Sequence, residues 1–241
     1  LTIWRAPTDN DRYIRQDWER AGYDRVIQRA KAFGWRRDGS TLELRTHVSL
    51  CAVSLSNIMG IDCLWRADDS GRVSLSVEAE RNTALPYLPR FGLRLFVPRF
   101  WSRAAYQGYG PMESYADKHQ AARLGCFEER AGGSFEHYLR PQESGSHWNC
   151  SRLELRDDAG VRLVRINSRS PFSFSFCEYT QEELAAEAHD FALERCEHNV
   201  LCIDFAQSGV GSNSCGPELR PEYRADQSHF SAEIEFDIVS D

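Results

Sequence analysis

The segment Pro141–Arg152 carries the densest mixture of side chains that could do chemistry. Glu143, His147, Trp148 and Arg152 supply a carboxylate, an imidazole, an indole and a guanidinium within this short span. Such a set could bind a sugar through ring stacking and hydrogen bonds. The same groups also serve as structural hydrogen-bonding partners, and we favour the structural interpretation.

A second acid and aromatic pair, Glu113 and Tyr115, follows the segment Gly108–Pro111, which the sequence predicts to be a turn. The two residues are two positions apart, so they lie on one face of an extended segment. A carboxylate beside an aromatic ring can hold a sugar, because the ring stacks on C–H groups and the acid accepts from hydroxyls. A capped loop explains the pair equally well, so both interpretations stay open.

The first polar motif, Arg5 to Asp11, is rich in residues that form turns. Pro7 fixes its own φ and disfavours helix at the preceding residue. Asp9, Asn10 and Asp11 have short side chains that cap turns and bind backbone amides, and Arg5 could pair with one of these acids. A sugar-site loop is one interpretation. We favour a hydrogen-bonded turn that locks the start of the domain against its neighbour.

The glycine-rich segment Gly209–Pro217 resembles a phosphate loop only superficially. A phosphate loop needs a helix directly after the glycines, and Pro217 and Pro221 forbid one. We expect Ser212–Gly216 to lie at one edge of the fold, either as a tight turn or as a loop over a sugar. Its candidate sugar-binding residues are Asn213, Ser214 and Cys215.

The elements that must position these residues are predicted to be mostly strands. Apolar and polar residues alternate along several segments, which is typical of half-buried antiparallel strands. Many strands with few helices predict an all-β antiparallel sandwich in a single domain over residues 1–241. The predicted strands are Leu42–Leu50, Val73–Ala79, Phe91–Val97, Arg152–Arg156, Val161–Asn167, Pro171–Cys177, Val200–Phe205 and Phe230–Val239.

Two segments break the alternation. Thr180 followed by Glu183 forms a capping box, which predicts a short helix ending near His189. The segment Asp17–Ala32 is predicted to be helical or irregular around Gly22.

The composition supports a folded domain with its own core and argues against nucleic-acid and membrane partners. The chain has 241 residues, 41% of them hydrophobic, which suffices for a core that disulfides need not support. Its net charge is -7 with acids and bases scattered, so we expect no nucleic-acid partner. No apolar run is long enough to span a bilayer, so we expect no membrane association.

The eight cysteines are dispersed and include no CxxC pair. We interpret them as free thiols of a cytoplasmic protein; the sequon Asn149-Cys150-Ser151 leaves secretion as an alternative. His147 and Cys150 could supply half a zinc site, but no second ligand pair has the required spacing, so we expect no metal site in this chain.

Four segments, taken in order, resemble the small-chain domain of family-2 glycoside hydrolases of the β-galactosidase type, the last of five domains in those enzymes. The first is the strongest match, and together the four span about nine-tenths of the chain. They are Trp4–Asp11 (W-R-A-P-T-D-N-D), Gly110–Tyr115 (G-P-M-E-S-Y), Arg140–Gly145 (R-P-Q-E-S-G) and Gly209–Pro217 (G-V-G-S-N-S-C-G-P).

The resemblance implies a galactose-mutarotase-like supersandwich that supports a catalytic barrel and edges its sugar site. In some of these enzymes the last loop carries a Trp that reaches the sugar, and that position falls on Cys215 here, so any contact must be smaller. At His147 and Trp148 relatives commonly carry Arg or Lys. The implied partners are the remaining domains or a large subunit, a carbohydrate substrate and further copies in a homo-oligomer.

The chain itself is not expected to hydrolyse a glycoside. A retaining glycosidase needs two carboxyl groups about 5 Å apart. The resemblance places both on a barrel of about 250 residues with alternating strands and helices, for which this chain has no room. We expect no cofactor in this chain, and any Mg²⁺ would belong to that barrel.

An alternative is a free-standing mutarotase-like sugar epimerase or a carbohydrate-binding domain. An epimerase would need a His acid opposite a Glu or Asp base. His119, His137 or His147 could act with Glu113 or Glu143, but no spacing selects a pair.

Overall fold

The computed structural model describes residues 1–211 and 215–238. Antiparallel strands dominate this part of the chain, which confirms the all-β prediction. The strands are β1 (Ile27–Asp38), β2 (Thr41–Cys51), β3 (Asn57–Ala67), β4 (Arg72–Arg81), β5 (Arg90–Val97), β6 (Arg103–Gly110), β7 (Arg123–Arg130), β8 (Ser146–Arg156), β9 (Arg162–Cys177), β10 (Asn199–Gln207) and β11 (His229–Ile238).

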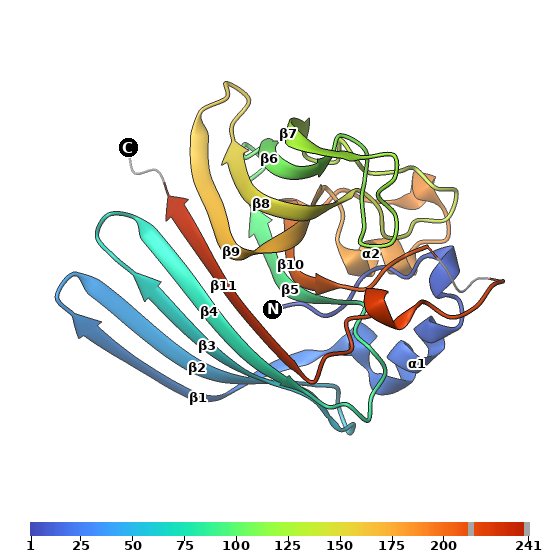
Figure 1. Ribbon diagram of the computed structural model, residues 1–241, viewed down its shortest axis with the longest axis horizontal. Helices are drawn as coiled ribbons and strands as arrows, with labels where there is room; N and C mark the ends of the chain where they lie inside the picture. The colour runs from blue at the N-terminus through green and yellow to red at the C-terminus, as the bar shows by residue number, and fades with distance from the viewer. Residues whose placement is uncertain (212–214, 239–241) are drawn as a thin grey trace.

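The strands form one hydrogen-bonded network in the order β1-β2-β3-β4-β11-β9-β8-β6-β7, with β10 and β5 joined to it through β9. The first half of β9 pairs with β11 and its second half pairs with β10. The two layers of the expected sandwich are therefore continuous through this one strand. Figure 1 shows the strongly curved sheet of β1 to β4 and β11 on one side of the molecule and the β6, β7 and β8 strands on the other.

The main core lies between the β5–β10 pair and the curved sheet. Phe91 of β5 packs on Phe230 of β11, with 5.3 Å between ring centroids, and on Phe205 of β10 at 5.8 Å. Leu75 and Val77, on the inward face of β4, are completely buried in the same cluster. Alternate residues of β4 thus face the core, as the period-two pattern predicted.

Gly22 ends the first helix, α1 (Ile14–Ala21), in the left-handed conformation with φ of 79°. A short 3-10 turn, Tyr23–Arg25, follows it. The prediction that Asp17–Ala32 is helical or irregular is right up to this turn and wrong beyond it, because β1 begins at Ile27. Every residue of β1 is exposed, so burial produces no alternation that a sequence pattern could reveal.

Thr180 caps the second helix, α2 (Gln181–Ala186), and its hydroxyl accepts a hydrogen bond from the Glu183 amide at 3.1 Å, as predicted. The helix ends at Ala186 rather than near His189. The predicted turn Gly108–Pro111 is also wrong in part, because β6 runs through Gly110 and only then does the chain bend. Within the described residues, no helix is both long and apolar enough to cross a bilayer. The cysteines that the structure shows as unbridged thiols include Cys51, Cys63, Cys126, Cys150, Cys177, Cys196 and Cys202.

Candidate functional site

The four motif segments meet around one hollow of about 500 Å³, which we call the motif hollow. It lies where the N-terminal segment, the loops after β6 and before β8, and the loop after β10 come together. The sequence separates these segments widely, so only the sheet topology brings them side by side. The lining residues are Thr8, Asp9, Asn10, Glu113, Tyr115, Asp117, Lys118, Tyr138, Gln142, Glu143, Val210 and Gly211.

Arg5 anchors the first motif and is completely buried. Its guanidinium donates to the Asp11 carboxylate at 2.7 Å and to the carbonyl oxygens of Ser208 and Gly209 at 2.5 and 3.0 Å. Asp11 in turn accepts from the Thr8 amide at 2.9 Å. The predicted pairing of Arg5 with a nearby acid is confirmed, and these contacts fit the favoured interpretation of a locked turn. Pro7 lies within this turn.

The chain leaving β10 is held from two sides at Val210. Asn10 donates through its side-chain amide to the Val210 carbonyl oxygen at 2.6 Å. Asp117 accepts from the amides of Val210 at 3.0 Å and Gly211 at 2.7 Å. A β-carbon at Gly209 would collide with the Asp117 carboxylate and would displace it from these two amides. The loop therefore begins in a fixed position at the edge of the motif hollow.

Glu113 and Tyr115 both line the motif hollow, and the Glu113 side chain has a structural task there. The Glu113 carboxylate accepts from the Gly145 amide at 2.8 Å and pairs with Lys118. Tyr115 is 2% exposed, and burial raises the pKa of its phenol well above the ordinary value. The Glu113 contacts are those of a capped loop; a sugar contact by this pair stays a prediction.

Glu143 belongs to a group of five buried charged residues, the buried ion cluster, made of Arg5, Asp11, Arg90, Glu143 and Asp204. The Arg90 guanidinium donates to Asp204 at 2.8 Å and to Glu143 at 3.3 Å. Burial raises the pKa of Glu143 and raises that of Asp204 to about 6, because desolvation outweighs the attraction of Arg90. Glu143 lines the motif hollow, whereas Arg90 and Asp204 are buried behind it, so the cluster extends from the motif hollow into the fold.

His147, Trp148 and Arg152 do not join Glu143 in one site. His147 is completely buried, with Nε2 3.1 Å from the Glu129 carboxylate and Nδ1 3.0 Å from the Tyr106 hydroxyl. Burial and these partners withdraw it from the motif hollow, so the prediction that it binds substrate has no support in this geometry. Trp148 lines a different hollow, described below. Arg152 pairs with Glu154.

The last candidate residues are Asn213, Ser214 and Cys215. Asn213 and Ser214 are outside the described residues. Cys215 is exposed. Asp117 and Arg90 are the main residues that the sequence interpretation missed. Asp117 lies in a tight turn, which the isolated bridge between Tyr115 and Lys118 closes. An acid in a turn was the only, weak sequence signal for it.

The carboxylates around the motif hollow are mostly engaged in holding the structure. Glu113 pairs with Lys118, Asp117 binds two backbone amides, and Glu143 faces Arg90. Asp9 is exposed, and its backbone amide donates to Gln142 at 2.8 Å. Over residues 1–211 and 215–238, no group of three His, Cys, Asp or Glu residues is placed to hold a metal ion. The arrangement fits polar contacts with a partner surface or a sugar at its rim.

The profile of the "Beta galactosidase small chain" family matches residues 1–238. The chain belongs to this family. The small-chain domain is 41% identical over its full length to a β-galactosidase of Actinobacillus pleuropneumoniae and 36% identical over 97% of its length to one of Staphylococcus xylosus. It spans only about a quarter of those relatives, 23% and 24% respectively.

A solved aldose epimerase homologue from C. elegans aligns with 86% of the small-chain domain and 69% of its own chain. The identity is 9% and the TM-score 0.37, a likeness too slight to support a conclusion.

Proposed function

We propose that this small-chain domain is part of a β-galactosidase that hydrolyses terminal β-galactosides. The relatives that share its full length carry that name, and the domain accounts for about a quarter of each. Their remaining length can hold a catalytic barrel with the carboxylate pair and any Mg²⁺. The isolated domain is then inactive and contributes by supporting that barrel.

The motif hollow is the surface through which we propose this support acts. The observation that carries the proposal is the convergence of all four family motifs on that one hollow. The chain leaves β10 clamped by Asn10 and Asp117, so the following loop can extend from a fixed point towards a neighbouring barrel. We propose that Asn213, Ser214 and Cys215 edge the sugar site there.

The proposal also covers the cellular compartment and the oligomeric state of the enzyme. We propose a cytoplasmic enzyme, because dispersed unbridged thiols suit a reducing compartment. We also propose a homo-oligomer, because Phe33 and Trp35 of edge strand β1 are 70% and 67% exposed and need a covering surface.

The test compares the full-length enzyme with the 241-residue chain in hydrolysis of a nitrophenyl β-galactoside. The chain alone should show no activity above buffer. In the full-length enzyme, Asn213→Ala should raise KM, because a loop residue that contacts sugar contributes to substrate binding. Cys215→Trp should change KM in either direction. Unchanged kinetics in both variants would return the loop to a structural role.

Ser231→Ala is a matched control for these loop variants, since Ser231 is an exposed residue of β11. It should leave both kcat and KM unchanged. If the isolated chain, purified free of other glycosidases, hydrolyses the substrate, the placement of the catalytic carboxylates outside this chain is wrong.

A further inference from the structure

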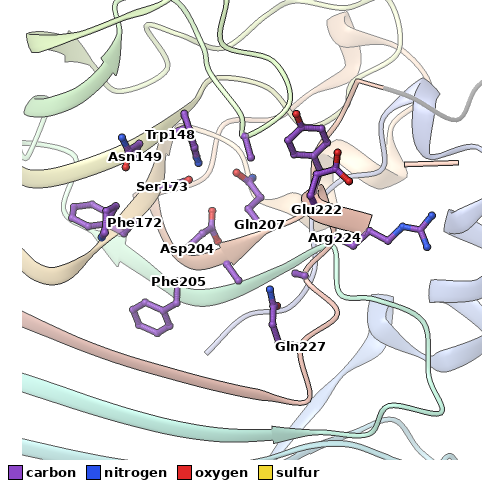
Figure 2. Close-up of a pocket in the computed structure, with 15 residues that line it drawn as sticks. Trp148, Asn149, Phe172, Ser173, Asp204, Phe205, Gln207, Glu222, Arg224 and Gln227 are labelled. Atoms are coloured by element: carbon purple, nitrogen blue, oxygen red, sulfur yellow. The ribbon is translucent and has the colours of Figure 1, made fainter. Parts of the chain in front are cut away.

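The structure has a second hollow of about 210 Å³, the β10 hollow, whose lining residues Figure 2 shows in close-up. Strands β8, β9 and β10 supply most of it, and the segment after the 3-10 turn Pro221–Tyr223 closes one side. Ala116 lines the β10 hollow, whereas its neighbours Tyr115 and Asp117 line the motif hollow. The two hollows are therefore separate spaces on opposite sides of one short segment.

Asp204 is the unusual feature of the β10 hollow. Its side chain is buried, with Oδ2 accepting from Arg90 at 2.8 Å. Its other oxygen, Oδ1, is buried without a hydrogen-bond partner among the described residues. A buried carboxylate oxygen is a strong acceptor, and leaving it unpaired is costly. A donor that enters the β10 hollow would remove that cost.

The remaining walls combine a fixed aromatic ring with amide side chains. Trp148 is held by stacking on His119, with 4.6 Å between ring centroids and an interplanar angle of 27°. Figure 2 shows Trp148, Asp204 and Gln207 around the same space, with Gln227 on the opposite side. Aromatic surface provides contact for the C–H groups of a sugar, and carboxylate and amide groups bind its hydroxyls.

We propose that the β10 hollow binds a single neutral hexopyranose, with a sugar hydroxyl donating to Asp204 Oδ1. The hollow has room for one small polar ligand and not for a chain of sugars. An anionic ligand is disfavoured, because the unpaired group is itself a carboxylate in a cluster that already has three acids and two arginines. This site is distinct from the sugar site proposed for the complete enzyme and does not depend on it.

The test titrates D-galactose and D-glucose into the 241-residue chain by isothermal calorimetry, with saturation-transfer NMR as a second readout. A ligand of this size should bind with a dissociation constant in the low millimolar range. Asp204→Asn should weaken binding at least tenfold, since the sugar hydroxyl then meets a neutral amide in place of a charged carboxylate acceptor. Gln227→Ala at the exposed rim should weaken it about threefold without changing the melting temperature.

A pair of tryptophan variants and one variant at the motif hollow test whether binding occurs at the β10 hollow. Trp148→Phe, within the β10 hollow, should lower the affinity about threefold. Trp35→Phe, its control, changes an exposed tryptophan on β1 and should leave the affinity unchanged. Asp9→Ala, at the motif hollow, should also leave the affinity unchanged; a loss there would assign binding to the other hollow and overturn the proposal. The proposal is equally overturned if neither sugar binds saturably up to about 50 mM, in which case water alone satisfies Asp204.

Discussion

Replacing Glu143 with glutamine should stabilise the domain at neutral pH. In the buried ion cluster two guanidinium groups, of Arg5 and Arg90, face three carboxyl groups. When all are ionised the cluster has one excess negative charge among largely buried side chains. Glu143→Gln removes that charge and keeps an oxygen that can accept from Arg90, which Glu143 Oε1 now does at 3.3 Å.

The magnitude follows from Asp204, whose pKa rises from 3.8 to about 6 on folding. Below pH 3.8 the group is protonated in both states and costs nothing. Between about pH 4 and 6 the folded state holds a proton that the unfolded state has lost, so stability falls as the pH rises. Each pKa unit corresponds to about 1.4 kcal/mol, so the loss is roughly 3 kcal/mol once the pH exceeds 6. The raised pKa of Glu143 acts in the same direction.

Glu143→Gln should recover about 1–2 kcal/mol of this loss at pH 7.5, because one buried charge is no longer desolvated and Asp204 ionises more easily. Urea unfolding followed by tryptophan fluorescence at pH 4.5, 5.5, 6.5 and 7.5 gives the difference between variant and wild type. That difference should grow with pH. Glu233→Gln, which breaks an exposed pair with Arg169, is the matched control and should change stability by less than about 0.5 kcal/mol. A variant that is less stable than wild type at pH 7.5, or a difference that is constant with pH, would refute the reasoning.

Three further changes test other contacts. Arg5→Ala should cost about 3–5 kcal/mol in urea unfolding, because Asp11 is left as a buried charge without its partner; a cost under about 1 kcal/mol would contradict this. Gly92→Ala should lower the melting temperature strongly, because its β-carbon would overlap the backbone of β10, whereas Gly34→Ala on open strand β1 should change it little; equal effects would show that the close packing is unimportant. Trp35→Ser should leave the melting temperature of the chain unchanged but weaken assembly of the full-length enzyme in analytical ultracentrifugation; unchanged assembly would show that β1 is not covered.

Only part of the strand pattern could be predicted from the sequence, because β3 and β6 also bury alternate residues and were missed. Alternation predicted β2, β4 and β11, because each turns a row of apolar side chains inward. Strands β5 and β10 could be predicted as short apolar segments, and both are continuously buried over their first residues. Strand β1 is exposed on both faces. In β6 the glycines looked like a turn, yet Gly108 is glycine because a β-carbon there would collide with Cys150 of the neighbouring strand.

The candidate site also combines contacts that could be predicted from the sequence with contacts that could not. Arg5 and Asp11 are six residues apart, so their pairing could be inferred from the motif itself. Arg90 and Asp204 are 114 residues apart and are brought together by the pairing of β5 with β10, and nothing local in the sequence indicates that contact. For His147 the sequence predicted a contact that the structure does not have. Its closeness in sequence to Trp148 suggested a shared site, but successive side chains of an extended segment point to opposite faces.

The place of β11 in the sheet has a consequence for biosynthesis. Its residues are the last strand of the described chain, yet it lies between β4 and β9 in the interior of the sheet, where Phe230 pairs with Ala79 across more than half of the sequence. During translation the edges of β4 and β9 must wait unpaired until this segment emerges, and unpaired edges are templates for aggregation. A premature stop just before His229 would remove the whole of β11, and it would not trim the sheet at its margin. It would divide the sheet in two, and the nascent chain would present both open edges to the folding machinery of the cell.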